Sequence, residues 1–195
     1  MGIDGLLRAL KKVLIQCTAN MQLKVNPDTG DREEDFQYLI YTEGLDKPEE
    51  APEEKEPTAE AGRPPHVFLM NTPERSDLVS QIPYLMIQLL NGKDKRNADT
   101  GDEESTANVR ILVATYNDDG EDGGLQVLEI IERIRIMLFK GRLLDQQYMI
   151  QHPFDYEIYP DDTGVYYLGE INTVWSVPTI ERTAFFIEDC LKKGD

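Results

Sequence analysis

The sequence is poor in the residues that carry most metal chemistry and much catalysis. It holds only two histidines and two cysteines in 195 residues. His66 and His152 have no cysteine or second histidine beside them at a metal-ligand spacing, so no metal site is predicted. The sequence also lacks a Gly-x-Ser-x-Gly elbow, a phosphate-binding glycine loop and a dinucleotide fingerprint. We therefore expect no catalytic residues, no cofactor and no enzyme activity.

Long apolar runs and basic residues are also scarce. No stretch approaches the ~18 consecutive apolar residues of a transmembrane helix, and the N-terminus lacks the pattern of a secretory signal. Asp and Glu number 37 against 20 Lys and Arg, which gives a net charge of −17. A surface of that charge disfavours binding to nucleic-acid phosphates and to anionic membranes. We expect neither specific DNA binding nor membrane binding.

The two cysteines lie near opposite ends of the chain. Cys17 and Cys190 each sit among apolar residues. This setting favours two buried, reduced thiols and an intracellular folding environment. A disulfide between them is the alternative that the sequence leaves open.

The clearest structural pattern lies between Ala107 and Arg182. The β-branched run Asn108–Tyr116 predicts a strand. Apolar residues at 3- and 4-residue spacing predict a helix over 125–138 with one buried face. Two further strand-like runs, Tyr148–Tyr159 and Val165–Val177, flank a turn sequence that contains glycine, which predicts a hairpin.

The first third of the chain has a weaker pattern. Residues 5–20 predict an amphipathic helix with Asp4 as its N-cap. Met21–Val25 and Phe36–Tyr41 are expected to form short strands around a polar turn. Because a helix of this pattern is more often core-facing than membrane-bound, we expect it to pack against the sheet.

Two acidic segments are predicted to be loops. Residues 43–65 form an insert whose first nineteen residues carry eight acidic residues, three prolines and no aromatic residue, too little apolar surface to offset the entropy of ordering. Order resumes at 66–70, followed by a largely apolar strand over 82–90. We expect this strand to pair with 108–116 in antiparallel fashion, with residues 91–107 as a long acidic hairpin loop.

These elements predict a single domain over 1–195 of the α+β class. The expected sheet is mostly antiparallel, with four or slightly more strands and with helices on one face. The expected order is a helix, a strand pair, two more strands, a second helix and a closing strand pair. In the last strand, Trp175 lies on the more apolar side and should anchor the sheet to a helix. The pattern over 179–191 fits either a short helix or a strand.

Two motifs suggest chemistry and are better explained as turns or caps. Asp-Thr-Gly occurs at 28–30 and at 99–101, as in aspartic proteases, but both copies lie in polar, loop-like sequence. We interpret both as turns. The acidic run 117–122 resembles a calcium loop, yet its first and last positions would be Thr115 and Gln126, which are not the required Asp and Glu. An N-cap for the following helix is the better interpretation.

Together with the N-terminal helix, four segments resemble a known family. They are the strand 82–87, the strand 109–116 ending in Tyr-Asn-Asp-Asp, the helix 128–135 (Leu-Glu-Ile-Ile-Glu-Arg-Ile-Arg) and 175–182 (Trp-Ser-Val-Pro-Thr-Ile-Glu-Arg). The chain resembles the tail terminator, or tail completion, proteins of long-tailed bacteriophages and of prophages of Gram-positive bacteria. The resemblance covers most of 82–182; the acidic insert is not part of the family pattern.

The resemblance implies a structural protein of the virion. Tail terminators form a hexameric ring that caps the head-proximal end of the tail tube, stops tube polymerisation and presents a docking surface to the head connector. The implied partners are further copies of the chain, the tail tube protein and the connector, and genomic DNA would pass through the lumen without specific binding. The implied location is the tail or neck of the virion, after assembly in the cytoplasm of the bacterial host.

The candidate protein-interface residues are charged residues of the loops and of the segment after the last strand. They are Asp99, Asp102, Glu103, Glu104, Asp118, Asp119, Glu181 and Arg182. If acidic residues faced the lumen, DNA would slide past without sticking.

Two other functions remain open. One is another neck protein, such as a head completion protein, which patterns of this kind separate poorly from a terminator. The other is an acidic DNA mimic that inhibits a host DNA-binding enzyme. A mimic should carry carboxylates along ordered elements, whereas here they concentrate in loops, and the central helix balances Glu129 and Glu132 with Arg133 and Arg135.

Overall fold

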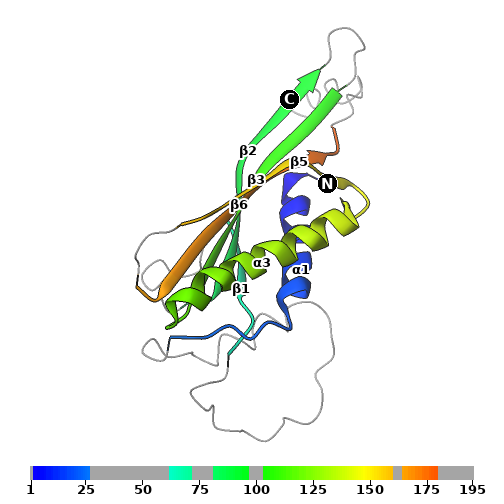
Figure 1. Ribbon diagram of the computed structural model, residues 1–195. Coiled ribbons are helices and arrows are strands. Elements are labelled where there is room, and N and C mark those ends of the chain that lie inside the picture. The colour runs from blue at the N-terminus through cyan, green and yellow to red at the C-terminus, as the bar shows by residue number, and fades with distance from the viewer. Residues whose placement is uncertain (1, 27–61, 72–80, 97–102, 160–163, 180–195) are drawn as a thin grey trace, which may run out of the picture.

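A six-stranded sheet with two helices on one face forms the body of the protein (Figure 1). The computed structural model describes residues 2–26, 62–71, 81–96, 103–159 and 164–179. Their elements are α1 (Ile3–Thr18), β1 (His66–Leu69), β2 (Tyr84–Arg96), β3 (Glu103–Tyr116), α3 (Gly120–Gly141), β4 (Leu143–Leu144), β5 (Tyr148–Ile158) and β6 (Tyr166–Val177).

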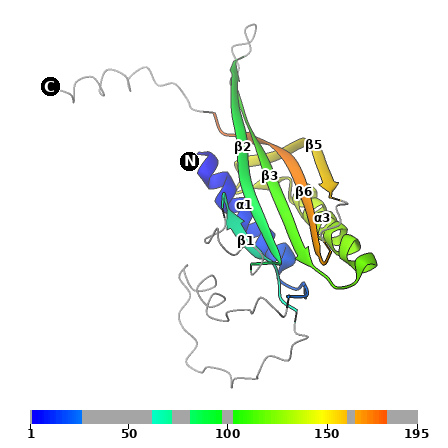
Figure 2. The ribbon, with the colours of Figure 1, turned by 90° about the vertical axis from the view of Figure 1, so that its left-hand side faces the viewer.

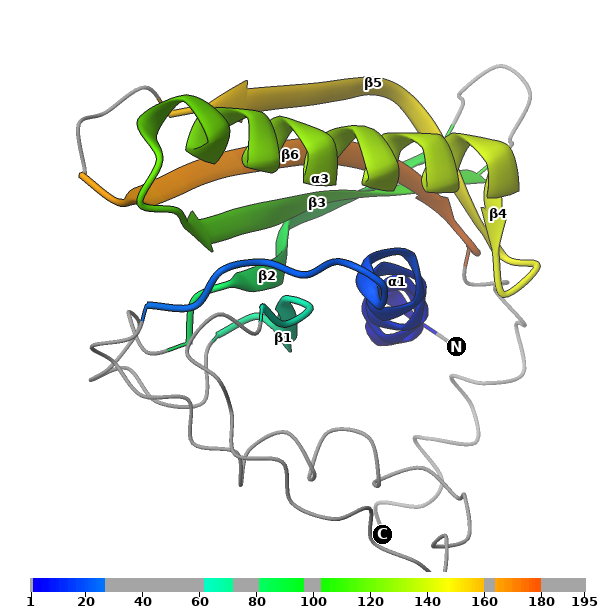
Figure 3. The same ribbon diagram turned by 60° about the horizontal axis from the view of Figure 1, so that its bottom comes forward.

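The strands lie in the order β1-β2-β3-β6-β5-β4. The predicted antiparallel pairing of the strands at 82–90 and 108–116 is confirmed, and so is the pairing of the last two long strands. The α+β class with helices on one face is also confirmed (Figure 3). The predicted four-stranded sheet and element order do not match, because β1 adds in parallel to β2 and makes the sheet mixed. Parallel pairing joins segments distant in sequence, so no local turn signals it.

The largest departure from the prediction concerns the loop expected at 91–107. Residues 91–96 and 103–107 instead extend β2 and β3 into a long antiparallel ribbon that runs past the helices (Figure 2). The side chains are polar on most positions of β2 here, so no apolar alternation reveals the strand. Pairing stabilises it instead, because β3 continues to pair with β6 as far as Ser105 opposite Val177.

The N-terminal region also differs in detail from the prediction. The helix begins at Ile3 after Gly2, so Asp4 lies in its first turn and is not the N-cap. No strand forms at Met21–Val25; Leu23 makes an isolated antiparallel bridge with Arg63, at the end of the predicted insert. The expected strand at 36–41, residues 43–61 of the insert and the segment 180–191 lie outside the described residues.

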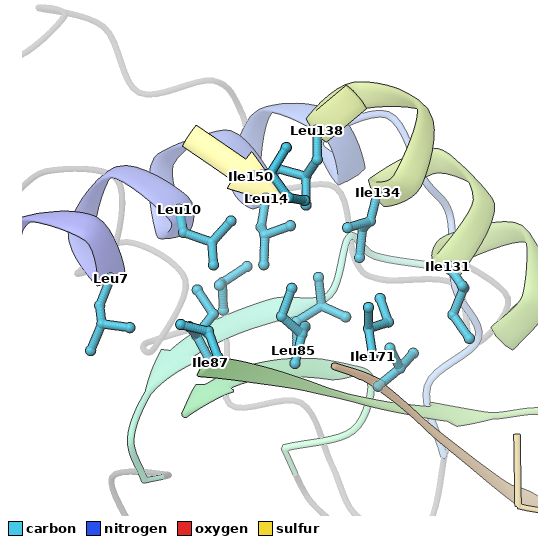
Figure 4. Close-up of a cluster of buried hydrophobic side chains, with 14 of the residues drawn as sticks. Leu7, Leu10, Leu14, Leu85, Ile87, Ile131, Ile134, Leu138, Ile150 and Ile171 are labelled. Carbon is cyan, nitrogen blue, oxygen red and sulfur yellow. The ribbon is translucent and has the colours of Figure 1, made fainter. Parts of the chain in front are cut away.

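Both helices bury an apolar stripe on the sheet (Figure 4). From α1, leucines at four-residue spacing point toward Leu85 and Ile87 of β2, while α3 places isoleucines at three- and four-residue spacing over Ile171 of β6. Fully burying each such side chain contributes about 1.5–3 kcal/mol. The helical members of the cluster that Figure 4 labels are Leu7, Leu10, Leu14, Ile131, Ile134 and Leu138.

The predicted role of Trp175 as an anchor is confirmed. Its side chain has 0% exposure and belongs to the main core cluster. The indole Nε1 donates to Thr173 Oγ1 at 2.9 Å, and that hydroxyl donates to the Val109 carbonyl at 2.9 Å. The only tryptophan of the protein is thus held by packing and by two consecutive hydrogen bonds that leave its indole N–H paired.

Candidate protein-interaction surface

The sheet face opposite the helices has a polar centre. Among the described residues no helix covers this face (Figure 2). Arg110 Nη2 donates to Gln88 Oε1 at 2.7 Å, Arg110 Nη1 lies 3.6 Å from Glu170 Oε2, and Asn172 Nδ2 donates to Glu170 Oε1 at 3.0 Å. A hydrogen bond with Glu170, and then burial, raise the pKa of Tyr159. The network links β2, β3 and β6 and holds a polar surface in a defined arrangement.

One end of the same face is apolar and mostly buried. Phe68 and Tyr84 make an edge contact with ring centroids 6.1 Å apart, and Tyr116 and Tyr166 pack at 5.8 Å. Burial raises the pKa of the Tyr84 hydroxyl. Since most members are buried, this cluster stabilises the fold and offers little surface to a partner. Its buried members are Phe68, Ile82, Tyr84, Met86 and Ala114.

Two stretches of strand have an unpaired edge. β2 pairs with β1 only over Tyr84–Ile87, and β5 pairs with β4 at Tyr148 and Met149, with one further backbone hydrogen bond from the Ile150 N–H to the Arg142 carbonyl. Within the described residues, the rest of each strand therefore pairs on one side alone. We name Asn91–Arg96 the β2 edge and Phe154–Ile158 the β5 edge. Unpaired N–H and C=O groups of this kind are templates for strand addition by another chain.

The outer side of α3 carries a shallow hollow of about 490 Å³. Phe139 stacks on His152 with centroids 5.0 Å apart and an interplanar angle of 17°. Ile136 is 50% exposed beside them, and Arg135 and Lys140 also line the hollow. This mixture of apolar and cationic side chains suits contact with another protein surface.

The N-terminus of α3 gathers acidic residues that act as a cap. Asp119 is the N-cap, and its carboxylate accepts from the backbone N–H groups of Glu121 and Asp122 at 3.0 and 3.3 Å. Asp118 forms an ion pair with Lys24, whose ammonium holds the pKa of Asp118 below its usual range. The same hydrogen bond raises the pKa of Lys24. The predicted capping role of this acidic run is confirmed.

The structure does not bring the predicted interface residues together. Asp99, Asp102, Glu181 and Arg182 lie outside the described residues. Glu103 and Glu104 are exposed at the start of β3, whereas Asp118 and Asp119 follow its end. The 14 residues of β3 separate the two pairs by roughly 45 Å at 3.3 Å per residue.

Sequence reasoning missed four charged residues on the two strand edges. These are Lys93 and Lys95 of the β2 edge, and Asp155 and Glu157 of the β5 edge. The signal was present as like charges two residues apart, which share one face of a strand. The prediction of a loop over 91–107 hides this signal for Lys93 and Lys95, and for Asp155 and Glu157 the sequence does not show that their strand has an unpaired edge.

The described residues hold no arrangement suited to metal or thiol chemistry. They contain no group of three His, Cys, Asp or Glu placed to hold a metal ion. The free thiol of Cys17 is half-buried, and desolvation raises its pKa to about 11, which makes it a poor nucleophile. In the described part of the chain, neither helix has the length and apolar character needed to span a bilayer.

Comparisons with known proteins give no relative from which a role could be transferred. No family model matches the chain, and no curated protein matches it in sequence.

Proposed function

We propose that the protein is a structural protein of a bacteriophage virion that caps the head-proximal end of the tail tube as a homohexameric ring. In this role it ends tube polymerisation and provides the docking surface for the head connector. It acts in the tail or neck, after assembly in the bacterial cytoplasm, and needs no cofactor. Genomic DNA passes through the ring without specific binding.

The observation that carries the proposal is a sheet with an unpaired edge stretch on each of its two sides. A chain with two different unpaired strand edges can associate head to tail. Head-to-tail contacts generate a closed ring when the rotation between neighbouring copies adds up to a full turn. The described parts of the four segments that resemble tail terminators overlap β2, β3, α3 and β6. The long β2–β3 ribbon and the hollow on α3 are further surfaces on which a tube or connector protein could dock.

The DNA-mimic alternative gains no support from the described surface. Apart from Glu121 and Asp122 in the first turn of α3, the acidic residues of α1 and α3 are paired with arginines: Asp4 with Arg8, Glu129 with Arg133, and Glu132 with Arg135. Residues 27–61, which contain 13 acidic and 3 basic residues, hold most of the net charge. A mimic of a DNA strand needs ordered rows of free carboxylates, which the helices do not offer.

The test is the growth of tail tubes from a purified bacteriophage tail tube protein. We expect substoichiometric amounts of the protein to stop elongation, giving shorter tubes by electron microscopy, while tube protein alone keeps growing. Unchanged tube lengths together with binding to the head connector would indicate another neck protein. Unchanged lengths together with inhibition of a DNA-binding enzyme would indicate the mimic.

A further inference from the structure

The β2 edge and the β5 edge lie toward opposite sides of one sheet and run in opposite directions. Between β2 and β5 the sheet makes three antiparallel steps, through β3 and β6. Seen from the helix side, β2 and β5 lie on opposite sides of β3 and β6 (Figure 3). If a second copy is placed beside the first by rotation about an axis along the strands, its β2 edge therefore meets the β5 edge in antiparallel orientation.

The charges of the two edges are complementary. Lys93 and Lys95 on the β2 edge and Asp155 and Glu157 on the β5 edge are all exposed. The register places all four on the sheet face opposite the helices: Asp155 and Glu157 pair with Asn172 and Glu170, and Lys93 and Lys95 pair with Thr106 and Glu104. Side chains that share a face of paired strands lie side by side and interact.

One register satisfies both charge pairs at once. In an antiparallel pair the residue numbers of opposed positions have a constant sum, so Lys93 opposite Glu157 requires Lys95 opposite Asp155. On the other face, the same register places Arg96 opposite the ring of Phe154, which favours a cation–π contact. Pro153 lies in a bulge just before the β5 edge and cannot donate to a ladder, so it limits slippage in that direction.

The short edge strands do not obstruct this pairing. β4 occupies β5 only at Tyr148 and Met149, and β1 occupies β2 only up to Ile87. In the register above, both lie beyond the ends of the five opposed pairs, which run from Arg96 opposite Phe154 to Gly92 opposite Ile158. The contact therefore uses only stretches that have no strand partner on that side among the described residues.

The environment of Glu157 also favours a lysine of a second copy as its partner. Glu157 is directly opposite Glu170 in the β5–β6 pair. Arg110 lies against Glu170, but Glu157 has no ion pair with another described residue. Like charges on opposed positions destabilise a pair of strands. Lys93 of a second copy would compensate this charge.

We propose that copies of this chain join head to tail through antiparallel pairing of the β2 edge of one copy with the β5 edge of the next, with Lys93 opposite Glu157 and Lys95 opposite Asp155. The occupant of each edge is a second copy of the chain. The inference rests on the proposed function to the extent that it supplies the contact that closes the ring.

The register also determines how the strands lie in the ring. Within one copy, the ladder through Asn172 and Arg110 places Asp155 level with Gln88, seven residues before Lys95. A displacement of about 23 Å along the strands over four strand spacings of about 4.8 Å inclines them by roughly 50°, near the 35–45° of closed barrels.

The direction of the displacement decides which face lines the channel. With β2 pointing up and seen from the helices, β5 lies to the left of β2 (Figure 3). In the proposed register the next copy to the left therefore lies about 23 Å lower along the strands, because its Lys95 is level with Gln88 of the first copy. About an axis perpendicular to this displacement, the strands rise to the right when seen from the helices, which is the right-handed coil that strand twist favours when the helices lie outside. The polar face with Arg110 and Glu170 then lines the channel.

The test exchanges the charges of the edges in the full-length chain. The variants K93E/K95E and D155K/E157K should each weaken association at least about tenfold per interface and lose the ring mass in light scattering, with unchanged circular dichroism. The variant that combines all four substitutions should regain it. The matched control K11E/K12E, which reverses two lysines of α1, should keep the ring.

A disulfide ladder tests the register independently of charge. In a chain with Cys17 and Cys190 replaced by alanine, Lys93→Cys with Glu157→Cys should crosslink copies into a ladder that ends at the ring, because opposed Cα atoms lie about 4.5–5.5 Å apart. Asn91→Cys with Asp155→Cys, out of register by about 13 Å, should not. Each double-cysteine variant is oxidised both as the purified protein and after incubation with tail tubes.

The outcomes separate this contact from the proposed function. Full ring mass for both charge-reversal pairs, or crosslinking only in the out-of-register pair, would overturn the contact even if the protein caps tubes. A ring that needs these charges and crosslinks in register, but ignores tube ends, would support the contact and overturn the proposed function.

Discussion

Two neighbouring glycines of α3 should respond in opposite directions to the same substitution. Gly123 faces the sheet: a Cβ built on it would lie 2.1 Å from Tyr167 Cε2 and 2.3 Å from Tyr167 Cζ. A Cβ on Gly124 would have nothing within 4 Å. Gly123→Ala should therefore destabilise the protein relative to Gly124→Ala.

The magnitude follows from two terms. Replacing glycine by alanine inside a helix stabilises it by about 1 kcal/mol, and this term is nearly the same for adjacent positions. Carbon atoms pack at about 3.5–4.0 Å, so the Tyr167 ring would have to move by about 1.5 Å. Overpacking of this kind costs about 1–3 kcal/mol. Because the helix terms cancel, the two variants should differ by about 1–3 kcal/mol in their free energy of unfolding.

Urea unfolding followed by tryptophan fluorescence, at one protein concentration, measures this difference. With a slope of about 2 kcal/mol per molar urea, the midpoints should be about 0.5–1.5 M apart, and Gly124→Ala should be at least as stable as the wild type. In a Tyr167→Ala background the penalty of Gly123→Ala should disappear. Equal stability of the two single variants, or a penalty that persists without the Tyr167 ring, would refute the packing of α3 on β6 described here.

Three further predictions concern single side chains. Thr173→Val removes the acceptor of the buried Trp175 Nε1 and should lower the free energy of unfolding by about 1–3 kcal/mol; no loss in urea unfolding would contradict the hydrogen bond. Asp118→Asn should lower stability at pH 7, and its effect should be smaller at pH 2. The lowered pKa of Asp118, caused by Lys24, makes its stabilisation present above its unfolded pKa and lost as pH falls through the folded value; an effect that is the same at both pH values would contradict this. The Cys17 thiol, with a pKa of about 11, should react with iodoacetamide far more slowly at pH 8 in the folded than in the urea-unfolded protein, as measured by peptide mass spectrometry; equal rates would contradict its burial.

Local sequence patterns could predict the elements that bury one face, because burial of one face requires apolar residues at a regular spacing. The alternation around Trp175 predicts β6 nearly in full, and the apolar stripe of α3 predicts its central part, residues 125–138 of Gly120–Gly141. The predicted helix does not include residues 120–124, because this Gly-Glu-Asp-Gly-Gly segment has no apolar residue and glycine is a weak helix former. The Asp119 cap and the fit of Gly123 against Tyr167 offset that weakness.

The parts that could not be predicted depend on pairing between distant segments. The ribbon at 91–96 and 103–107 has no apolar alternation on β2, so its strand character comes from hydrogen bonds to β3 and from the pairing of β3 with β6. β1 is four residues long and pairs in parallel with β2, and parallel strands are not joined by a tight turn whose sequence could indicate the pairing. The candidate site was missed for the same reason: the charges of the two edges acquire meaning only when the sheet order is known.

Electron microscopy of tail tubes assembled in the presence of the protein should settle whether it caps them. We expect a ring of six copies at one end of each tube, with a combined mass of six 22.3 kDa chains. Tube ends without added density, or density of this protein along the whole tube, would contradict it.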